Sequence, residues 1–161
     1  MTEFSHFNHD GEAIMVDVGS KAETERVAVA KGSIYMSKSC FDAVINKEIA
    51  KGDVLGIARI AGIMGAKKTS DLIPLCHMIN LTNVTIDFEL NEAESAITAV
   101  CTAKTVGKTG VEMEAIMGVN IALVTIYDMC KAIDKNMRIE KIHLLEKSGG
   151  KSGHFIYEGP V

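Results

Sequence analysis

The stretch Gly110–Asp134, GVEMEAIMGVNIALVTIYDMCKAID, is the longest apolar run in the chain. The other elements of the fold are predicted from their positions relative to it. Its middle, Ala115–Ile126, carries no charge, which indicates a segment that is buried on nearly all sides. The run is too short and too closely flanked by charges to span a membrane. Its alanines, methionines and leucine favour a helix, although its β-branched residues weaken that preference. We therefore predict a buried central helix.

Charged residues stand at both ends of this run. Asp128 and Lys131 are three residues apart, so a helix makes them neighbours, either as an ordinary surface ion pair or as part of a site. Glu112 and Glu114 share a face if the segment is extended, and they diverge by about 200° if the helix has already begun. Acids near a helix N-terminus also stabilise the helix dipole, which is a structural explanation that needs no function.

The flanking segments alternate between strand and helix patterns. A hairpin is predicted from the period-two alternation of Leu81–Leu90 and of the return strand around Ile97–Thr102, with a turn of about five residues between them. Further strands are predicted over Glu25–Tyr35 and around Ile139, Ile142 and Leu144. A short helix capped by Ser37 or Ser39 and a second helix capped by Asp53 are also predicted. Thr105–Gly110 is predicted to be a loop, and Glu146–Val161 an irregular tail.

This order, β-α-α-β-β-α-β, becomes β-α-β-β-α-β when one short helix is set aside. We therefore predict an α+β fold, the ferredoxin-like sandwich, with a four-stranded antiparallel sheet and helices packed on one face. Glycines 56, 62 and 65 lie inside the predicted helix that follows Asp53. Glycine disfavours a helix interior, so we expect another backbone, from this subunit or a neighbour, to approach closely there.

The totals restrict the class of protein. A length of 161 residues with 47% hydrophobic residues fits a single domain over residues 1–161, with a mobile arm at 1–13 and a mobile tail at 154–161. A net charge of −4 argues against a dedicated nucleic-acid binder. The N-terminus lacks an apolar signal region, so the expected location is the cytoplasm, with no membrane partner.

Two segments imitate a phosphate-binding P-loop, but both lack its first glycine. Leu145 and Thr102 stand where that glycine is required, so a P-loop NTPase is disfavoured. KSGGKSG, residues 147–153, still offers lysines and open backbone N–H groups, and it fits either an anion-binding turn or a mobile tail. Cys76-His77 lacks paired ligands elsewhere, so no metal site is expected, and His77 is a candidate acid or base or a structural histidine.

Five separated motifs follow one another along the chain: MVDVGSKAETER, KGDVLGIARIAGIMGAKKTSDLIPLCH, GKTGVEMEA, YDMCKA and KSGGKSG. Together they resemble the molybdenum cofactor biosynthesis protein C (MoaC) family, the cyclic pyranopterin monophosphate synthases. The resemblance covers residues 14–153, and its specificity comes from the order of all five motifs.

The resemblance implies a lyase that converts 3′,8-cyclo-7,8-dihydro-GTP to cyclic pyranopterin monophosphate and releases diphosphate. It implies a homo-oligomer, a hexamer built as a trimer of dimers, and no firm cofactor, although a divalent cation could accompany the triphosphate. Carried over by motif, the catalytic residues are Asp128, Lys131, Lys51 and His77. The substrate-binding residues are Leu75, Cys76, His77, Glu112, Met113, Glu114, Lys147, Lys151, Lys21, Arg26 and Lys67.

Helix geometry adds an expectation of its own. If the segment between Glu114 and Asp128 is all helix, its 14 residues place the two about 21 Å apart along the axis. One small substrate does not easily reach both from a single helix, so we expect a second subunit to complete the pocket. Two other classes stay open on the residues alone: a non-catalytic nucleotide-binding oligomer and a metal-dependent phosphohydrolase.

Overall fold

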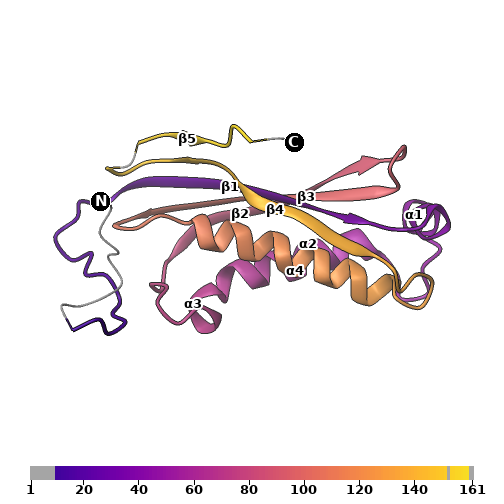
Figure 1. Ribbon diagram of the computed structural model, residues 1–161, viewed down its shortest axis with the longest axis horizontal. Helices are drawn as coiled ribbons and strands as arrows, with labels where there is room; N and C mark the ends of the chain where they lie inside the picture. The colour runs from indigo at the N-terminus through magenta and orange to yellow at the C-terminus, as the bar shows by residue number, and fades with distance from the viewer. Residues whose placement is uncertain (1–9, 152, 160–161) are drawn as a thin grey trace.

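The computed structural model describes residues 10–151 and 153–159 of the chain. Figure 1 shows an antiparallel sheet with two long helices beneath one face. The sheet contains β1 (Thr24–Tyr35), β2 (Leu81–Asn91), β3 (Ala96–Gly107), β4 (Arg138–Ser148) and the short β5 (Phe155–Ile156). The helices are α1 (Lys38–Ile45), α2 (Val54–Lys67), the one-turn α3 (Thr69–Leu72) and α4 (Glu112–Cys130).

The sheet order is β2-β3-β1-β4-β5, and every neighbouring pair is antiparallel. The four main strands have the 4-1-3-2 order that β-α-β-β-α-β connections generate, with α2 and α4 as the two connecting helices. The predicted ferredoxin-like α+β sandwich is therefore confirmed for the main strands. The fifth strand at the β4 edge is additional to the four that the sequence predicted.

Two helix starts follow their predicted caps. Ser37 Oγ accepts a hydrogen bond from the Cys40 N–H at 3.3 Å, and Asp53 Oδ1 accepts one from the Gly56 N–H at 3.0 Å. Each cap satisfies a backbone donor that has no partner within the first helical turn. These caps fix the starts of α1 and α2.

Several predicted boundaries were wrong. The predicted loop Thr105–Gly110 is in part strand, because β3 stays paired with β1 through Gly107. The irregular tail was predicted to start at Glu146, which is too early, because β4 continues to Ser148. The chain then returns as β5, which pairs with β4. The central helix is shorter than Gly110–Asp134 and runs from Glu112 to Cys130.

The hydrophobic core lies between the sheet and the helix pair. Its largest fully buried side chains include Ile34, Ile86, Ile97, Leu123 and Ile126. Helix α4 is long and apolar enough to cross a membrane by length and composition alone, but half of its tested window is buried against the rest of the molecule. Its hydrophobicity is therefore explained by its position in the core, as the sequence analysis expected.

The glycines of α2 mark the place where α2 and α4 cross. A Cβ added to Gly62 would lie 2.9 Å from the Gly118 carbonyl oxygen, 3.0 Å from Ile86 Cδ1 and 3.1 Å from the Ala122 Cβ, so the two helix backbones come close together there. A Cβ on Gly65 would meet the Ile121 side chain at 2.6 Å. The expected close approach of another backbone is thus made by α4 of the same chain, and only at Gly62 among the three glycines. A Cβ on Gly56 would meet only the capping carboxylate of Asp53.

We predict that Gly62→Ala lowers the free energy of unfolding by about 1–3 kcal/mol, because the added methyl group must separate the two helices. Gly107→Ala is the matched control, since a Cβ there meets nothing closer than 3.7 Å. Urea unfolding of both variants provides the measurement. Equal stabilities for the two variants would show that the helices do not need this contact distance.

Candidate functional site

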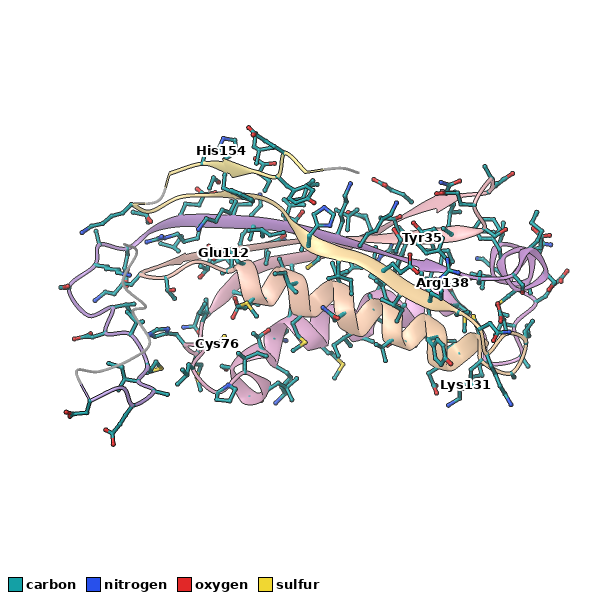
Figure 2. All side chains as sticks on the ribbon, in the orientation of Figure 1. Tyr35, Cys76, Glu112, Lys131, Arg138 and His154 are labelled. Carbon is teal, nitrogen blue, oxygen red and sulfur yellow. The ribbon has the colours of Figure 1, made fainter. Side chains whose placement is uncertain are left out.

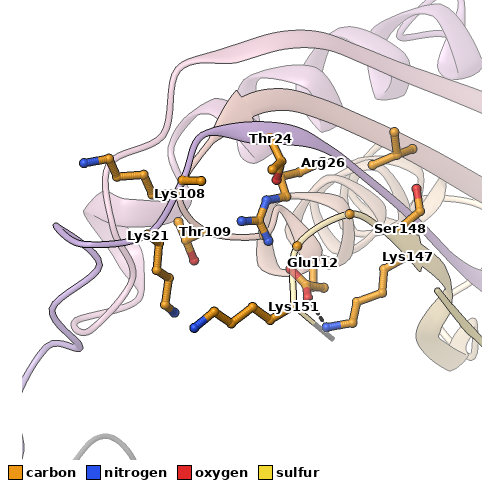
Figure 3. Close-up of a pocket in the computed structure, with 14 residues that line it drawn as sticks. Lys21, Thr24, Arg26, Lys108, Thr109, Glu112, Lys147, Ser148 and Lys151 are labelled. Carbon is orange, nitrogen blue, oxygen red and sulfur yellow. Dashed lines mark hydrogen bonds and ion pairs between the residues drawn. The ribbon is translucent and has the colours of Figure 1, made fainter. Parts of the chain in front are cut away.

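A cavity of about 490 Å³ opens where β1 begins, β4 ends and α4 starts. We call it the cationic cavity (Figure 3). Among the residues that the structure describes, one acidic residue, Glu112, lines the cavity, and the basic lining residues are Lys21, Arg26, Lys108, Lys147 and Lys151. In Figure 3 the side chains of Lys21 and Lys151 point toward one another. Five cations around one hollow repel one another unless an anion is bound, so the cavity is suited to a polyanion.

Several of these side chains are held by specific contacts. Lys147 Nζ donates to Glu112 Oε1 at 2.7 Å, and both side chains are about one quarter exposed. Arg26 Nε donates to the Gly107 carbonyl oxygen at 3.3 Å, which leaves the terminal nitrogens of the guanidinium for another partner. The buried Thr24 Oγ1 has no hydrogen-bond partner among the described residues, although Thr24 lines the cavity.

A second cavity, of about 320 Å³, adjoins the first, and we call it the His77 cavity. The two cavities share Lys21, Thr109, Gly110 and Glu112, so a ligand can extend from one into the other. The His77 cavity is lined in addition by the predicted substrate-binding residues Leu75, Cys76, His77, Met113 and Glu114.

His77 is placed by the segment that precedes β1. Its Nε2 atom lies 2.7 Å from the Val16 carbonyl oxygen, so Nε2 carries the proton and donates it to this acceptor. This contact leaves Nδ1 as the nitrogen that can accept a hydrogen bond from a ligand in the cavity. The predicted acid or base role of His77 is therefore restricted to Nδ1 as long as Val16 remains in place.

The structure answers the question that the sequence left open for Glu112 and Glu114. Helix α4 begins at Glu112, so the two carboxylates diverge around the helix. Glu112 faces Lys147, whereas Glu114 turns inward and is only 4% exposed. Burial, followed by the nearby charge of Glu112, raises the pKa of Glu114 from 4.5 to about 6. Glu114 can therefore exchange a proton near neutral pH, as a general acid or base requires.

This raised pKa predicts a pH dependence of stability. The native state holds the Glu114 proton more tightly than the unfolded state does, so the contribution to stability is complete below pH 4.5 and is lost as the pH rises through about 6. The difference between the native and unfolded pKa values of Glu114 corresponds to about 2 kcal/mol in the free energy of unfolding. Glu114→Gln should therefore match the original protein at low pH and exceed its free energy of unfolding by up to about 2 kcal/mol above pH 6.

Chemical denaturation across pH 4 to 7.5 would measure this difference. The control is Glu89→Gln, which makes the same chemical change at an exposed carboxylate of β2. If the Glu114→Gln and unmodified profiles ran parallel, Glu114 would have no raised pKa in the native state.

A third group, the Asp128 cluster, consists of Lys51, Asp128 and Lys131. Lys131 Nζ lies 2.7 Å from Asp128 Oδ1, and Lys51 Nζ lies 3.1 Å from Asp128 Oδ2 and 2.9 Å from the Asp128 carbonyl oxygen. The hydrogen bond from Lys131, and then that from Lys51, lowers the pKa of Asp128, while Asp128 raises the pKa of Lys131. All three side chains are about half exposed on an open surface hollow.

The Asp128 cluster lies far from the other two cavities. Figure 2 shows Glu112 and Lys131 at opposite ends of α4. Because α4 is continuous, Glu114 and Asp128 are about 21 Å apart along its axis. Lys67 is also separate, since it lines a different hollow of about 680 Å³ beside the start of β2. A single chain therefore brings together most of the predicted substrate-binding residues but neither Lys67 nor the Asp128 cluster.

Some lining residues were missed by the sequence analysis. Thr24, Lys108 and Thr109 line the cationic cavity, and Lys108 Nζ donates to the Gly19 carbonyl oxygen at 2.7 Å. The segment Gly107–Gly110 resembled a phosphate loop, and its glycine content was the available signal. Within the ranges that the structure describes, no three His, Cys, Asp or Glu residues lie close enough to hold a metal ion.

Comparison with known proteins gives a consistent result. The family model described as the MoaC family matches residues 15–150. A cyclic pyranopterin monophosphate synthase of Clostridium botulinum (strain Alaska E43 / Type E3) is 56% identical over 97% of this chain and 98% of its own length. Synthases of the same name from Heliobacterium modesticaldum (strain ATCC 51547 / Ice1) and Clostridium perfringens (strain SM101 / Type A) are 55% and 53% identical. These two alignments cover 98% and 96% of this chain, and 99% and 98% of the respective relatives.

Proposed function

The chain belongs to the MoaC family, and on that premise we propose that it is a cyclic pyranopterin monophosphate synthase, a lyase of molybdenum cofactor biosynthesis. It converts 3′,8-cyclo-7,8-dihydro-GTP to cyclic pyranopterin monophosphate and releases diphosphate. The observation that carries the proposal is the cationic cavity, which suits a triphosphate and adjoins a cavity with a buried, titratable carboxyl group. We assign this nucleotide-derived molecule to the site as its binding partner. We assign the protein to the cytoplasm.

The cationic cavity binds the triphosphate in this proposal. Formation of a cyclic phosphate requires a hydroxyl oxygen to attack the α-phosphorus while the bond to the β-phosphate breaks, so negative charge builds up on the departing diphosphate. Positive side chains that are already in place stabilise this charge without reorganising. The side chains that we assign to this role are those of Lys21, Arg26, Lys147 and Lys151.

The guanine-derived part of the substrate lies toward the His77 cavity. Opening the imidazole ring and closing the pterin both require proton transfers to and from ring nitrogens. Glu114, with a pKa of about 6, can give or take such a proton, and Nδ1 of His77 can accept a hydrogen bond. Leu75, Cys76 and Met113 supply the remaining contact surface, and Glu112 holds Lys147 in position at the boundary of the two cavities.

The Asp128 cluster supplies the other acid and base groups, and it does so from a neighbouring subunit. Asp128 is ionised near neutral pH and lies between two lysines, so its carboxylate can take a proton from the substrate while Lys51 and Lys131 hold it in position. The cluster is half exposed and about 21 Å from Glu114 along α4, which supports a site completed by a second copy of the chain.

We propose a homohexamer, arranged as a trimer of dimers, as the assembly that closes this site. The outer face of α2 supports an interface because Ile57, Ile60 and Met64 are 43%, 62% and 59% exposed on one side of the helix. Lys67 follows these residues on α2, so in this assembly it reaches the substrate from a subunit boundary.

The direct experiment is to incubate the purified protein with 3′,8-cyclo-7,8-dihydro-GTP and to measure both products by chromatography and mass spectrometry. We expect equal amounts of cyclic pyranopterin monophosphate and diphosphate. Binding without either product would favour a non-catalytic nucleotide-binding oligomer. Phosphate release without the pterin, abolished by a chelator, would favour a metal-dependent phosphohydrolase.

A further inference from the structure

The C-terminal segment His154–Tyr157 lies outside the residues that match the family model, which end at 150. We propose that this segment, which we call the C-terminal brace, positions the glycine turn Ser148–Lys151 and Lys147 at the cationic cavity. The inference rests on the proposed function, because it assigns the brace a role in binding the triphosphate. Figure 2 shows His154 at the same end of the molecule as Glu112.

The glycine turn is built directly against β1. Gly149 and Gly150 have φ values of +98° and +73°, which non-glycine residues rarely adopt. A Cβ on Gly149 would overlap the Glu25 carbonyl oxygen, and one on Gly150 would overlap Nη1 of Arg26. The turn therefore touches the Arg26 guanidinium, so a shift of the turn changes the place of both Arg26 and Lys151 in the cavity.

Backbone pairing holds the far side of this turn. Strand β5 pairs antiparallel with the end of β4, with Phe155 opposite Lys147 and Ile156 opposite Glu146. The Tyr157 N–H also donates to the Leu145 carbonyl oxygen at 2.8 Å. Because Lys147 lies within this pairing, the brace also fixes the backbone from which Lys147 reaches Glu112.

Two side chains of the brace anchor it to β4. His154 Nε2 lies 2.7 Å from Glu146 Oε1, a distance at which the imidazole N–H donates to the carboxylate. The Tyr157 ring packs against the His143 ring with centroids 4.3 Å apart and planes tilted by 40°. A Cβ on Gly159 would overlap the Tyr157 ring, so the chain lies close to this ring after the strand. Neither side chain is among the residues that line the cavity, and both act on it through the turn and through Lys147, which makes His154 and Tyr157 positioning residues.

The test compares the double variant His154→Ala/Tyr157→Leu with Ile156→Ala, a control in the same strand whose side chain is 57% exposed. We expect KM to rise about tenfold in the double variant, because losing two such contacts lowers the affinity by roughly a factor of ten. The kcat of the double variant should stay within about twofold of that of the unmodified protein. The control should keep both constants. Restoring the aromatic ring, as His154→Ala/Tyr157→Phe, should recover part of the loss in KM.

Titration with inorganic diphosphate separates this inference from the proposed function. The double variant should bind diphosphate about tenfold more weakly than the unmodified protein, and this holds even if the protein shows no turnover. If the unmodified protein turns over substrate and the double variant keeps both its KM and its diphosphate affinity, the brace has no positioning role. A fall in kcat alone, with unchanged KM, would also overturn the proposal. If the double variant does not fold, His154→Ala alone is measured against the same criteria.

Discussion

The Asp128→Asn protein is expected to lose about 10²- to 10⁴-fold in kcat, the range typical for the loss of a general acid or base. Asparagine keeps the size of the side chain and can still receive a hydrogen bond from Lys51 or Lys131, but it does not take up a proton. Substrate affinity should change much less, because the triphosphate is bound by a different group of residues. Steady-state kinetics on the purified variant would separate kcat from KM.

The chain offers a matched control for this substitution. Asp71 pairs with Lys68 at 3.1 Å, with side chains that are 55% and 66% exposed, so this exposed pair has the same three-residue spacing as Asp128 and Lys131. Asp71→Asn should leave kcat unchanged. Full turnover by Asp128→Asn would remove Asp128 from the chemistry, and an equal loss in Asp71→Asn would show that the effect reflects surface charge in general.

Mixing two inactive variants, Glu114→Ala and Asp128→Ala, is expected to restore activity. If each site takes Glu114 from one subunit and Asp128 from its partner, every mixed dimer contains one site with both residues and one with neither. Random association of equal amounts makes half of the dimers mixed, so about one quarter of all sites should recover. The measurement is the specific activity after subunit exchange, compared with each variant alone.

A second mixture provides the control for this result. Asp128 and Lys131 lie in one cluster of one chain, with 2.7 Å between their charged atoms. Asp128→Ala mixed with Lys131→Ala therefore leaves no site with both residues, and this mixture should stay inactive. No recovery in the first mixture despite confirmed exchange would contradict a shared site. Recovery in both mixtures would show that the variants stabilise one another without sharing a site.

The sequence predicted the main elements of the fold because each has a local signal. The alternation in β2 and β3, the caps Ser37 and Asp53, and the uncharged middle of α4 depend on residues close together in the chain. Strand β5 carries no such signal, since two residues show no periodicity and their pairing depends on β4. The continuation of β3 to Gly107 has the same cause, because β1 supplies the partners.

Most of the residues that line the two adjoining cavities could be selected from the sequence, but their arrangement could be predicted only in part. The order of the motifs selected the residues of the two adjoining cavities. The start of α4, which decides that Glu112 and Glu114 diverge, was not predictable because Val111 precedes the helix and no side chain caps it. The separation of Asp128 from Glu114 did follow from helical rise alone. Which hollow Lys67 lines depends on how α2 packs beside β2, and sequence spacing does not contain that information.

The most direct measurement is a crystal structure of the Asp128→Asn protein with 3′,8-cyclo-7,8-dihydro-GTP bound. We expect triphosphate oxygens within about 2.7–2.9 Å of the nitrogens of Arg26 and Lys147. The guanine-derived part of the same ligand should lie beside Lys131 and position 128 of a second subunit. A different result would contradict a site shared between subunits. In that result the ligand lies wholly within the cavities of one chain, and position 128 of every subunit is more than a Debye length of about 10 Å away.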